Sequence, residues 1–355
     1  MTKKYVPLSV INLSTQSDRL FFGAGGHGIS RYDIVRHPQL QKLNKHMRSL
    51  MWEPELVDMS SEKRSFDRMQ EPEQFVFTSN LKRQILLDSI QGRAPMTVFA
   101  PHCTDPVMEN CISTWSFFET IHSESYTHIL RAIYPDPSVI INDIPGIKEI
   151  ADCATSIAKT YDALQNNPSN ENLYLALVSA NALEALRFYV SFACTFSFAE
   201  RGFVEGSAKI VKLIARDESQ HLALTQHALK ILPKENPEFL EIAADHQHTA
   251  YSIFEEAGNQ EKQWAKYLFS HGPILGLSEE ILGQYVDYLF NRRTAAIGIA
   301  KPGTARLKNP LPWIEKWLSS DSVQVAPQEV ELSSYLSSVA LQNDLDGMDI
   351  SALLK

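Results

Sequence analysis

The sequence predicts an all-α protein, built as a bundle of about eight long helices. From about residue 38 almost to the end of the chain, apolar residues recur at the spacing of an amphipathic helix. Glycine and proline cluster between long segments, whereas a β-protein would show them at intervals of roughly 8–12 residues. Helices of this length exceed the average and suit an antiparallel bundle.

Eight segments carry the helical pattern. The predicted helices lie near residues 38–51, 67–91, 104–133, 145–164, 171–200, 204–232, 236–269 and 278–298. Breaker sequences separate them, because proline and asparagine favour turns over helix interiors. Asn-Asn-Pro-Ser at 166–169 marks one such turn, and Pro233 and Pro237 are expected to separate the sixth helix from the seventh.

The helical pattern divides the chain into three regions. Residues 1–35 are predicted to be irregular, with one possible strand at 5–13, and residues 36–320 form the helical domain. Residues 321–355 form a C-terminal tail that ends in the acidic stretch LQNDLDGMDISALLK. Its few apolar residues cannot bury enough surface to fold alone, so we expect the tail to stay flexible until a partner binds it.

Composition limits the class of protein. Hydrophobic residues make up 44% of the chain and charged residues 21%, which is enough for a sizeable core. The net charge of −9 disfavours contact with phosphate backbones, so no nucleic-acid partner is expected. The four cysteines form no Cys-x-x-Cys pair and no secretion signal is recognisable, which predicts a cytoplasmic protein with reduced thiols. The longest apolar run, 188–199, is shorter than the roughly 20 residues of a membrane span, so no membrane contact is expected.

Two segments contain Glu-x-x-His, at Glu119–His122 and at Glu218–His221. Residues three apart share a helix face, so each pair can direct two ligands at one point. Most isolated copies of this motif are solvated surface, but here each copy interrupts an apolar stripe. The stripes are Trp115, Glu119, His122, Tyr126, Ile129 and Ile133, and Val211, Ile214, Glu218, His221, Thr225 and Ala228. A carboxylate on such a face must be paired, neutralised or coordinated, because an isolated buried charge is very costly.

Two further predicted helices carry one carboxylate each on an apolar face. Asp88 ends the stripe that runs through Leu81 and Ile85. Glu184 lies at the centre of a second stripe, in one of the most apolar segments of the chain, which makes it hard to explain as a surface residue.

Four helices thus offer an acid, a Glu-x-x-His, an acid and a Glu-x-x-His, which is the arrangement of ferritin-like di-metal carboxylate bundles. Four carboxylates and two imidazoles can neutralise two divalent ions roughly 3.5–4 Å apart. Mostly oxygen ligands with two nitrogens suit iron or manganese, while a structural zinc site more often uses thiolates. The alternative is a set of unrelated buried ion pairs, for which Arg187 and Arg216 are the available partners.

At these residues the sequence resembles a known family, the small subunit of class I ribonucleotide reductase. The similarity runs from about residue 18 to about residue 340. The segments that carry it are WEPELVDMS (52–60), LLDSIQGR (86–93), ETIHSESYTHI (119–129), NALEALRFYVSFAC (181–194), IARDESQH (214–221) and VQVAPQEVELSSYL (323–336). The resemblance implies a ferritin-like bundle of about eight long helices around a di-metal carboxylate site, in a homodimer.

The resemblance also implies the ligands and the cofactor. The ligands of one ion are Asp88, Glu119 and His122, and those of the other are Glu184, Glu218 and His221. The implied cofactor is two iron ions per chain, with manganese as an alternative, joined by an oxo bridge derived from O₂, beside a stored tyrosyl radical. The sequence does not decide between the two metals, because both accept these ligands.

Tyr126 matches the radical tyrosine of the family, and its spacing agrees, because it lies four residues after His122 on the same helix face. A buried tyrosine is more commonly an ordinary core residue, and the predicted metal site beside it reverses that preference. Phe188, Phe192 and Ile214 match the apolar lining of the family's radical pocket, which would exclude water and reductant.

Trp52 and Asp217 match the family's relay between the metal site and the surface, with Asp217 hydrogen-bonded to the ligand His122. Tyr335 matches the tyrosine that passes the oxidising equivalent to the large subunit, where ribonucleoside diphosphates are reduced to the deoxy form. The acidic tail is expected to dock on that large subunit. Its candidate anchors are Leu345, Met348, Ile350, Leu353 and Leu354.

Two other function classes stay open at this point. A stand-alone ferritin-like di-iron oxidase would use the same ligands but would need an open apolar pocket, and would not need Trp52, Asp217 or Tyr335. An iron-storage bundle would need a cage-forming oligomer and would not need Tyr126.

Overall fold

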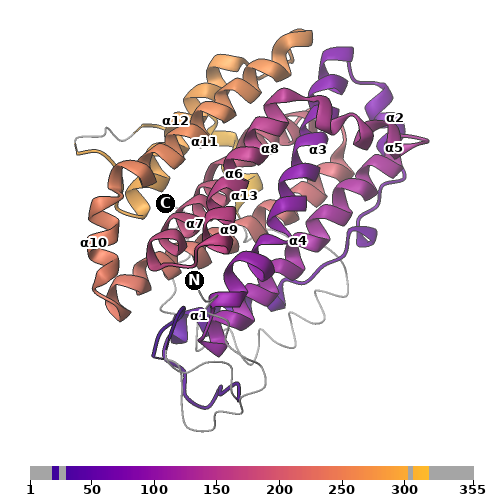
Figure 1. The fold of residues 1–355 in the computed structure, drawn as a ribbon. Coiled ribbons are helices and arrows are strands. Elements are labelled where there is room, and N and C mark those ends of the chain that lie inside the picture. Colours follow the sequence, from indigo (N-terminus) through magenta and orange to yellow (C-terminus); the bar gives the residue numbers. More distant parts are fainter. Residues whose placement is uncertain (1–17, 24–28, 303–306, 320–355) are drawn as a thin grey trace.

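The computed structural model describes residues 18–23, 29–302 and 307–319, and Figure 1 shows the long helices lying roughly along one direction. The expected strand at 5–13 and the tail residue Tyr335 lie outside these residues. Within the described part no strand forms, and two isolated β-bridges pair Phe21 with Cys103 and Ile274 with Leu277. The predicted all-α class is therefore confirmed.

Long helices occupy all eight predicted segments, although two of these segments are interrupted. They are α1 (Pro38–Ser49), α3 (Glu71–Gln91), α4 (Pro106–Ile133), α6 (Lys148–Asn166), α7 (Asn170–Ala182) continuing through η5 (Leu183–Arg187) into α8 (Tyr189–Ala199), α9 (Glu205–Glu235), α11 (Gln247–Leu268) and α12 (Glu279–Ala296). Shorter helices connect them. These are α2 (Glu62–Asp67), α5 (Pro137–Asn142), α10 (Glu238–Asp245) and α13 (Glu315–Leu318), the 3₁₀ turns η1 (Pro54–Leu56), η3 (Ala100–His102), η4 (Ile144–Gly146), η6 (Phe269–His271) and η7 (Pro312–Ile314), and the π turn η2 (Pro95–Phe99).

Local capping explains where several helices begin. Asp105 accepts hydrogen bonds from the backbone N–H groups of Val107 and Met108 and so starts α4. Gln70 and Glu73 form a capping box that starts α3 at Glu71, four residues later than the predicted boundary. The residues just before that box form the separate helix α2.

The prediction that Pro233 separates two helices was wrong. Pro233 lies inside α9, near its C-terminal end, and the backbone N–H of Asn236 still donates to the carbonyl of Leu232 at 3.0 Å. A proline in the last turn removes one N–H donor but leaves the later helical bond in place. The break comes at Asn236–Pro237, and the following predicted helix is itself divided at His246 into α10 and α11.

The predicted helix 171–200 contains a π turn. Leu183–Arg187 forms η5 between α7 and α8, and a π turn of this kind widens the helix locally and is frequent at functional sites. The stretch Asn170–Ala199 is long and apolar enough to cross a membrane, but 94% of its most apolar window is buried inside the protein. It is therefore a core helix of the bundle, as predicted for its apolar run.

Candidate metal centre

Four neighbouring helical segments bring the six predicted ligands together. Asp88 comes from α3, the first Glu-x-x-His from α4, Glu184 from η5 and the second Glu-x-x-His from α9. Each of these side chains is fully buried. The ligand atoms fall into two groups, and within each group they lie within 4.8 Å of one another. The groups are Asp88, Glu119, His122 and Glu218, and Glu119, Glu184, Glu218 and His221.

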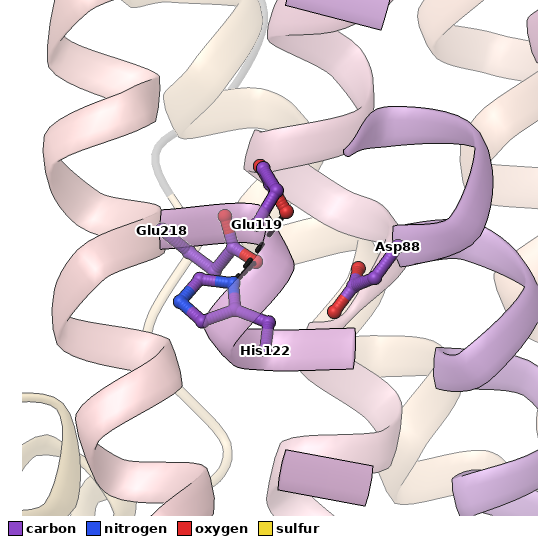
Figure 2. A group of neighbouring side chains, drawn as sticks. All are labelled: Asp88, Glu119, His122 and Glu218. Carbon is purple, nitrogen blue, oxygen red and sulfur yellow. Dashed lines mark ion pairs between the residues drawn. The ribbon is translucent and has the colours of Figure 1, made fainter. Parts of the chain in front are cut away.

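Glu119 and Glu218 belong to both groups and lie between the two histidines. Nδ1 of His122 lies 3.5 Å from Oε2 of Glu119 and 3.3 Å from Oε1 of Glu218, and Figure 2 shows Asp88 pointing toward these three residues. Nδ1 of His221 lies 3.2 Å from Oε1 of Glu119 and 3.0 Å from Oε2 of Glu218. Two carboxylates placed between two imidazoles are suited to bridging a pair of cations.

Several ligand atoms have no hydrogen-bond partner although they are buried. They are both carboxylate oxygens of Asp88, Oε2 of Glu119, Oε2 of Glu184, Oε1 of Glu218, Nδ1 of His122 and Nε2 of His221. Buried polar atoms are normally paired, and a buried unpaired carboxylate is costly. Four carboxylates with free oxygens and two imidazoles therefore fit a pair of divalent cations.

The pKa values of the clustered groups also reflect an excess of buried negative charge. Burial, reinforced by the neighbouring carboxylates, raises the pKa of Asp88 and of Glu184 well above the usual range. Burial opposes the protonation of both histidines, but hydrogen bonds to carboxylates outweigh it and raise the pKa of His221 to about 9. The raised pKa values of Asp88, Glu184 and the histidines thus favour bound protons at the place where cations would balance the acids.

The alternative reading, unrelated buried ion pairs, is wrong. Arg187 donates to Cys153 Sγ, Gln260 and Ser156, and Arg216 donates to Asp217 and to the carbonyl of Leu50. Neither arginine is paired with one of the four clustered carboxylates.

Two outer residues that the sequence did not single out as functional donate hydrogen bonds to the clustered carboxylates. Trp115 donates its indole N–H to Oε1 of Glu119 at 2.9 Å, and Gln91 donates its amide N–H to Oε1 of Glu184 at 2.7 Å. Partners of this kind fix how a ligand faces the metal. Trp115 was expected to be the apolar end of a stripe, and Gln91 lies three residues after Asp88, a spacing that could have indicated it.

Tyr126 lies one turn after His122 on α4 and is fully buried. Burial raises the pKa of Tyr126 well above its usual range, and the charges of Asp88 and Glu218 add to this effect. The phenol is therefore protonated at neutral pH. Phe188, Phe192 and Ile214 are also fully buried, and the rings of Phe188 and Phe192 stack with their centroids 5.8 Å apart.

The predicted relay residues form one hydrogen-bonded chain. Nε2 of His122 lies 3.3 Å from Oδ2 of Asp217, and the indole N–H of Trp52 donates to the same oxygen at 2.7 Å. Arg216 donates to the other oxygen, Oδ1, at 3.1 Å. Asp217 thus joins a candidate ligand to a buried tryptophan.

Comparison with known proteins identifies the family. The sequence pattern described as "Ribonucleotide reductase, small chain" matches residues 31–310. The chain is 46% identical over 343 residues to the ribonucleoside-diphosphate reductase subunit beta of Haemophilus influenzae, covering 89% of this chain and 91% of that protein. It is 44% identical over 367 residues to the ribonucleoside-diphosphate reductase 1 subunit beta of Escherichia coli O157:H7, covering 95% and 97%.

A solved structure shares the fold. The ribonucleotide reductase R2 subunit from Clostridium botulinum superposes with a TM-score of 0.81 over 87% of this chain and 98% of that one, at 23% sequence identity. That likeness supports the helical architecture, and the more similar sequences extend over the segments that carry the candidate ligands. The chain belongs to the ribonucleotide reductase small-chain family.

Proposed function

We propose that this chain is the radical-generating small subunit of a class I ribonucleoside-diphosphate reductase, and that it holds two metal ions beside Tyr126. The observation that carries the proposal is the pair of overlapping ligand groups, fully buried and sharing Glu119 and Glu218. Asp88, Glu119 and His122 would hold one ion, and Glu184, Glu218 and His221 the other.

A bound pair of iron or manganese ions would supply reductive activation of O₂ and so a one-electron oxidant. Tyr126 then gives up one electron and its phenolic proton to become a neutral tyrosyl radical. The carboxylate of Asp88, whose charge acts on the Tyr126 hydroxyl, is the candidate acceptor for that proton. Phe188, Phe192 and Ile214 keep water and reductants away from the radical oxygen.

The oxidising equivalent leaves through Trp52 and Asp217 and continues through Tyr335 to the large subunit. Asp217 accepts hydrogen bonds from both the relay tryptophan and Arg216, so it can hold His122 and Trp52 in fixed orientation as charge moves. The large subunit binds the ribonucleoside diphosphate and reduces it. The small subunit acts as a homodimer in the cytoplasm.

The rival functions fit the site less well. A stand-alone di-iron oxidase needs room for its substrate beside the ions, but all six ligands and the three lining residues are fully buried. It would also have no use for a buried tryptophan hydrogen-bonded to Asp217. An iron-storage bundle would not need Tyr126 in the same buried site.

The test is electron paramagnetic resonance on protein that has been loaded with Fe(II) and exposed to O₂, and separately with Mn(II). A tyrosyl signal is expected, and Tyr126→Phe should abolish it while leaving two ions bound per chain. Absence of a radical with either metal, at full metal occupancy, would refute the proposal.

A further inference from the structure

A buried hydrogen-bond chain connects Glu184 to the outer helix α6. Gln91 donates from Nε2 to Oε1 of Glu184 at 2.7 Å, and the hydroxyl of Tyr161 donates to Oε1 of Gln91 at 2.9 Å. Gln91 is fully buried and Tyr161 is 4% exposed. The polar groups of Glu184, Gln91 and Tyr161 are therefore shielded from water, which would otherwise compete for these hydrogen bonds.

These two hydrogen bonds set which way the Gln91 amide faces. A glutamine presents an NH₂ donor at one end and a carbonyl acceptor at the other. With the Tyr161 hydroxyl donating to the carbonyl, the NH₂ group faces Glu184. The reverse orientation would place the carbonyl of Gln91 against an oxygen of Glu184. When a cation keeps that carboxylate ionised, no proton lies between these two acceptors, so the contact is unfavourable.

The bond from Gln91 engages one oxygen of Glu184 and leaves the other free. Oε1 accepts from Gln91, whereas Oε2 has no hydrogen-bond partner. The carboxylate is thus presented to the ligand group of Glu119, Glu218 and His221 through one available oxygen.

This support matters because Glu184 lies in a π turn rather than in a regular helix. The same turn ends at Arg187, which donates to Cys153 at 2.8 Å and to Ser156 at 3.2 Å. Cys153, Ser156 and Tyr161 all belong to α6. A single outer helix therefore holds the π turn directly through Arg187 and indirectly through Gln91.

We propose that Gln91 and Tyr161 are positioning residues that hold Glu184 for the second metal ion and set the affinity of that ion. The inference rests on the proposed di-metal function and names residues that the function itself does not require. The other ligand group, built on Asp88 and His122, does not contain Glu184. Loss of these hydrogen bonds should therefore weaken the binding of one ion much more than the binding of the other.

The experiment is titration of the metal-free full-length protein with Mn(II), followed by calorimetry and by electron paramagnetic resonance. Gln91→Met keeps the shape of the side chain but removes the donor. It should lower the affinity for the second ion about ten- to a hundredfold. Tyr161→Phe keeps the ring but frees the Gln91 amide to turn. It should lower the affinity for the second ion by less, about three- to tenfold. In both variants the signal of a single bound Mn(II) should persist at two equivalents, where the wild type shows a coupled pair.

Tyr134→Phe is the matched control. It removes a tyrosine hydroxyl that bonds to Thr78 at 2.6 Å, away from the ligands, and should leave both affinities within about twofold. Equal weakening of both ions in Gln91→Met and Tyr161→Phe, or unchanged binding in both, would overturn the inference. A wild-type protein that binds fewer than two ions would instead contradict the proposed function, so the two failures are distinguishable.

Discussion

The indole N–H of Trp52 donates to Oδ2 of Asp217 at 2.7 Å, although the two residues are 165 positions apart in the sequence. The same oxygen lies 3.3 Å from Nε2 of His122. Trp52 is 1% exposed, so this contact is shielded from solvent although the residue lies in the connection between α1 and η1. One carboxylate oxygen therefore joins the candidate metal centre to an oxidisable ring.

Trp52→Phe should separate radical formation from radical use. Phenylalanine keeps an aromatic ring but lacks the N–H and is much harder to oxidise. We expect normal metal loading and a normal Tyr126 radical, with deoxynucleotide formation by the complex with the large subunit reduced to background. Spectroscopy and turnover should be measured on the same preparation.

Trp264→Phe is the control for that substitution. It removes another buried indole N–H, which bonds to Asn80 at 2.9 Å outside the relay. This variant should keep its turnover at temperatures where it is folded. If the two variants lose turnover equally, the relay role of Trp52 is wrong.

Ile214→Ser should shorten the life of the radical more than it lowers its initial yield. The change leaves space and a hydroxyl in a fully buried position of the proposed lining, so water and small reductants gain access. Decay of the tyrosyl signal after addition of a water-soluble reductant measures the effect. Ile157→Ser, an equally buried change on α6, should leave the decay unchanged, and similar decay in both variants would argue against a lining role for Ile214.

Removal of residues 336–355 should abolish turnover with the large subunit while leaving the radical intact. The tail lies outside the described residues, so this prediction depends on its acidic, sparsely apolar sequence, which is typical of segments that fold on binding. Binding of the truncated and full-length chains to the large subunit can be compared by calorimetry. Turnover that survives the deletion unchanged would show that the tail has no docking role.

The sequence was sufficient to predict which six side chains come together, because each of them interrupts or ends an apolar stripe. A buried carboxylate needs a partner, and a carboxylate on an apolar helix face can be recognised from the sequence of that helix alone, as at Glu119 and Glu218. The family resemblance was needed to connect Trp52 with Asp217, because their contact depends on how distant segments pack. Spacing within one helix contains no information about such a pair.

Other features depended on geometry that a sequence pattern does not encode. The π turn around Glu184 arises in a segment whose apolar composition resembles an ordinary core helix. The spacing of Gln91 three residues after Asp88 places it on the same face of α3, but its bond to Glu184 crosses from α3 to η5 and so depends on helix packing. Pro233 misled the prediction because proline is costly in a helix interior, but here it lies close to the C-terminal end of α9.

Glu261→Gln should lower the free energy of unfolding of the metal-free protein by about 3–5 kcal/mol, because it leaves the buried Arg83 without a charged partner. The side chains of Arg83 and Glu261 are 1% and 0% exposed, and they form an ion pair. Replacement of both by Met and Leu should be much less harmful, since no buried charge remains. Urea unfolding measures the difference.

The exposed pair of Lys148 and Asp152 gives the control for this ion pair. Asp152→Asn should cause no measurable change, because solvent screens the interaction. The buried-charge explanation fails if the Arg83/Glu261 double replacement destabilises the protein as much as Glu261→Gln alone.

Metal binding to the metal-free protein should release protons at neutral pH. Ligands bind cations only in their deprotonated form, and hydrogen bonds to Glu119 and Glu218 outweigh burial and raise the pKa of His221 to about 9. Below that pH the imidazole holds a proton that the cation must displace, and the raised pKa of Asp88 and of Glu184 adds further protons. The apparent affinity should therefore rise as the pH is raised toward 9 and fall as it is lowered.

Calorimetric titration with Mn(II) at one pH, in two buffers of different ionisation enthalpy, measures the number of protons released. A binding enthalpy that differs between the buffers is expected, with at least one proton released per chain. His221→Gln removes one titrating ligand and should reduce that number, whereas His227→Gln, a histidine of α9 outside the ligand groups, should not. Identical enthalpies in the two buffers would mean that the ligands are already deprotonated, and the charge balance inferred for the metal-free site would be wrong.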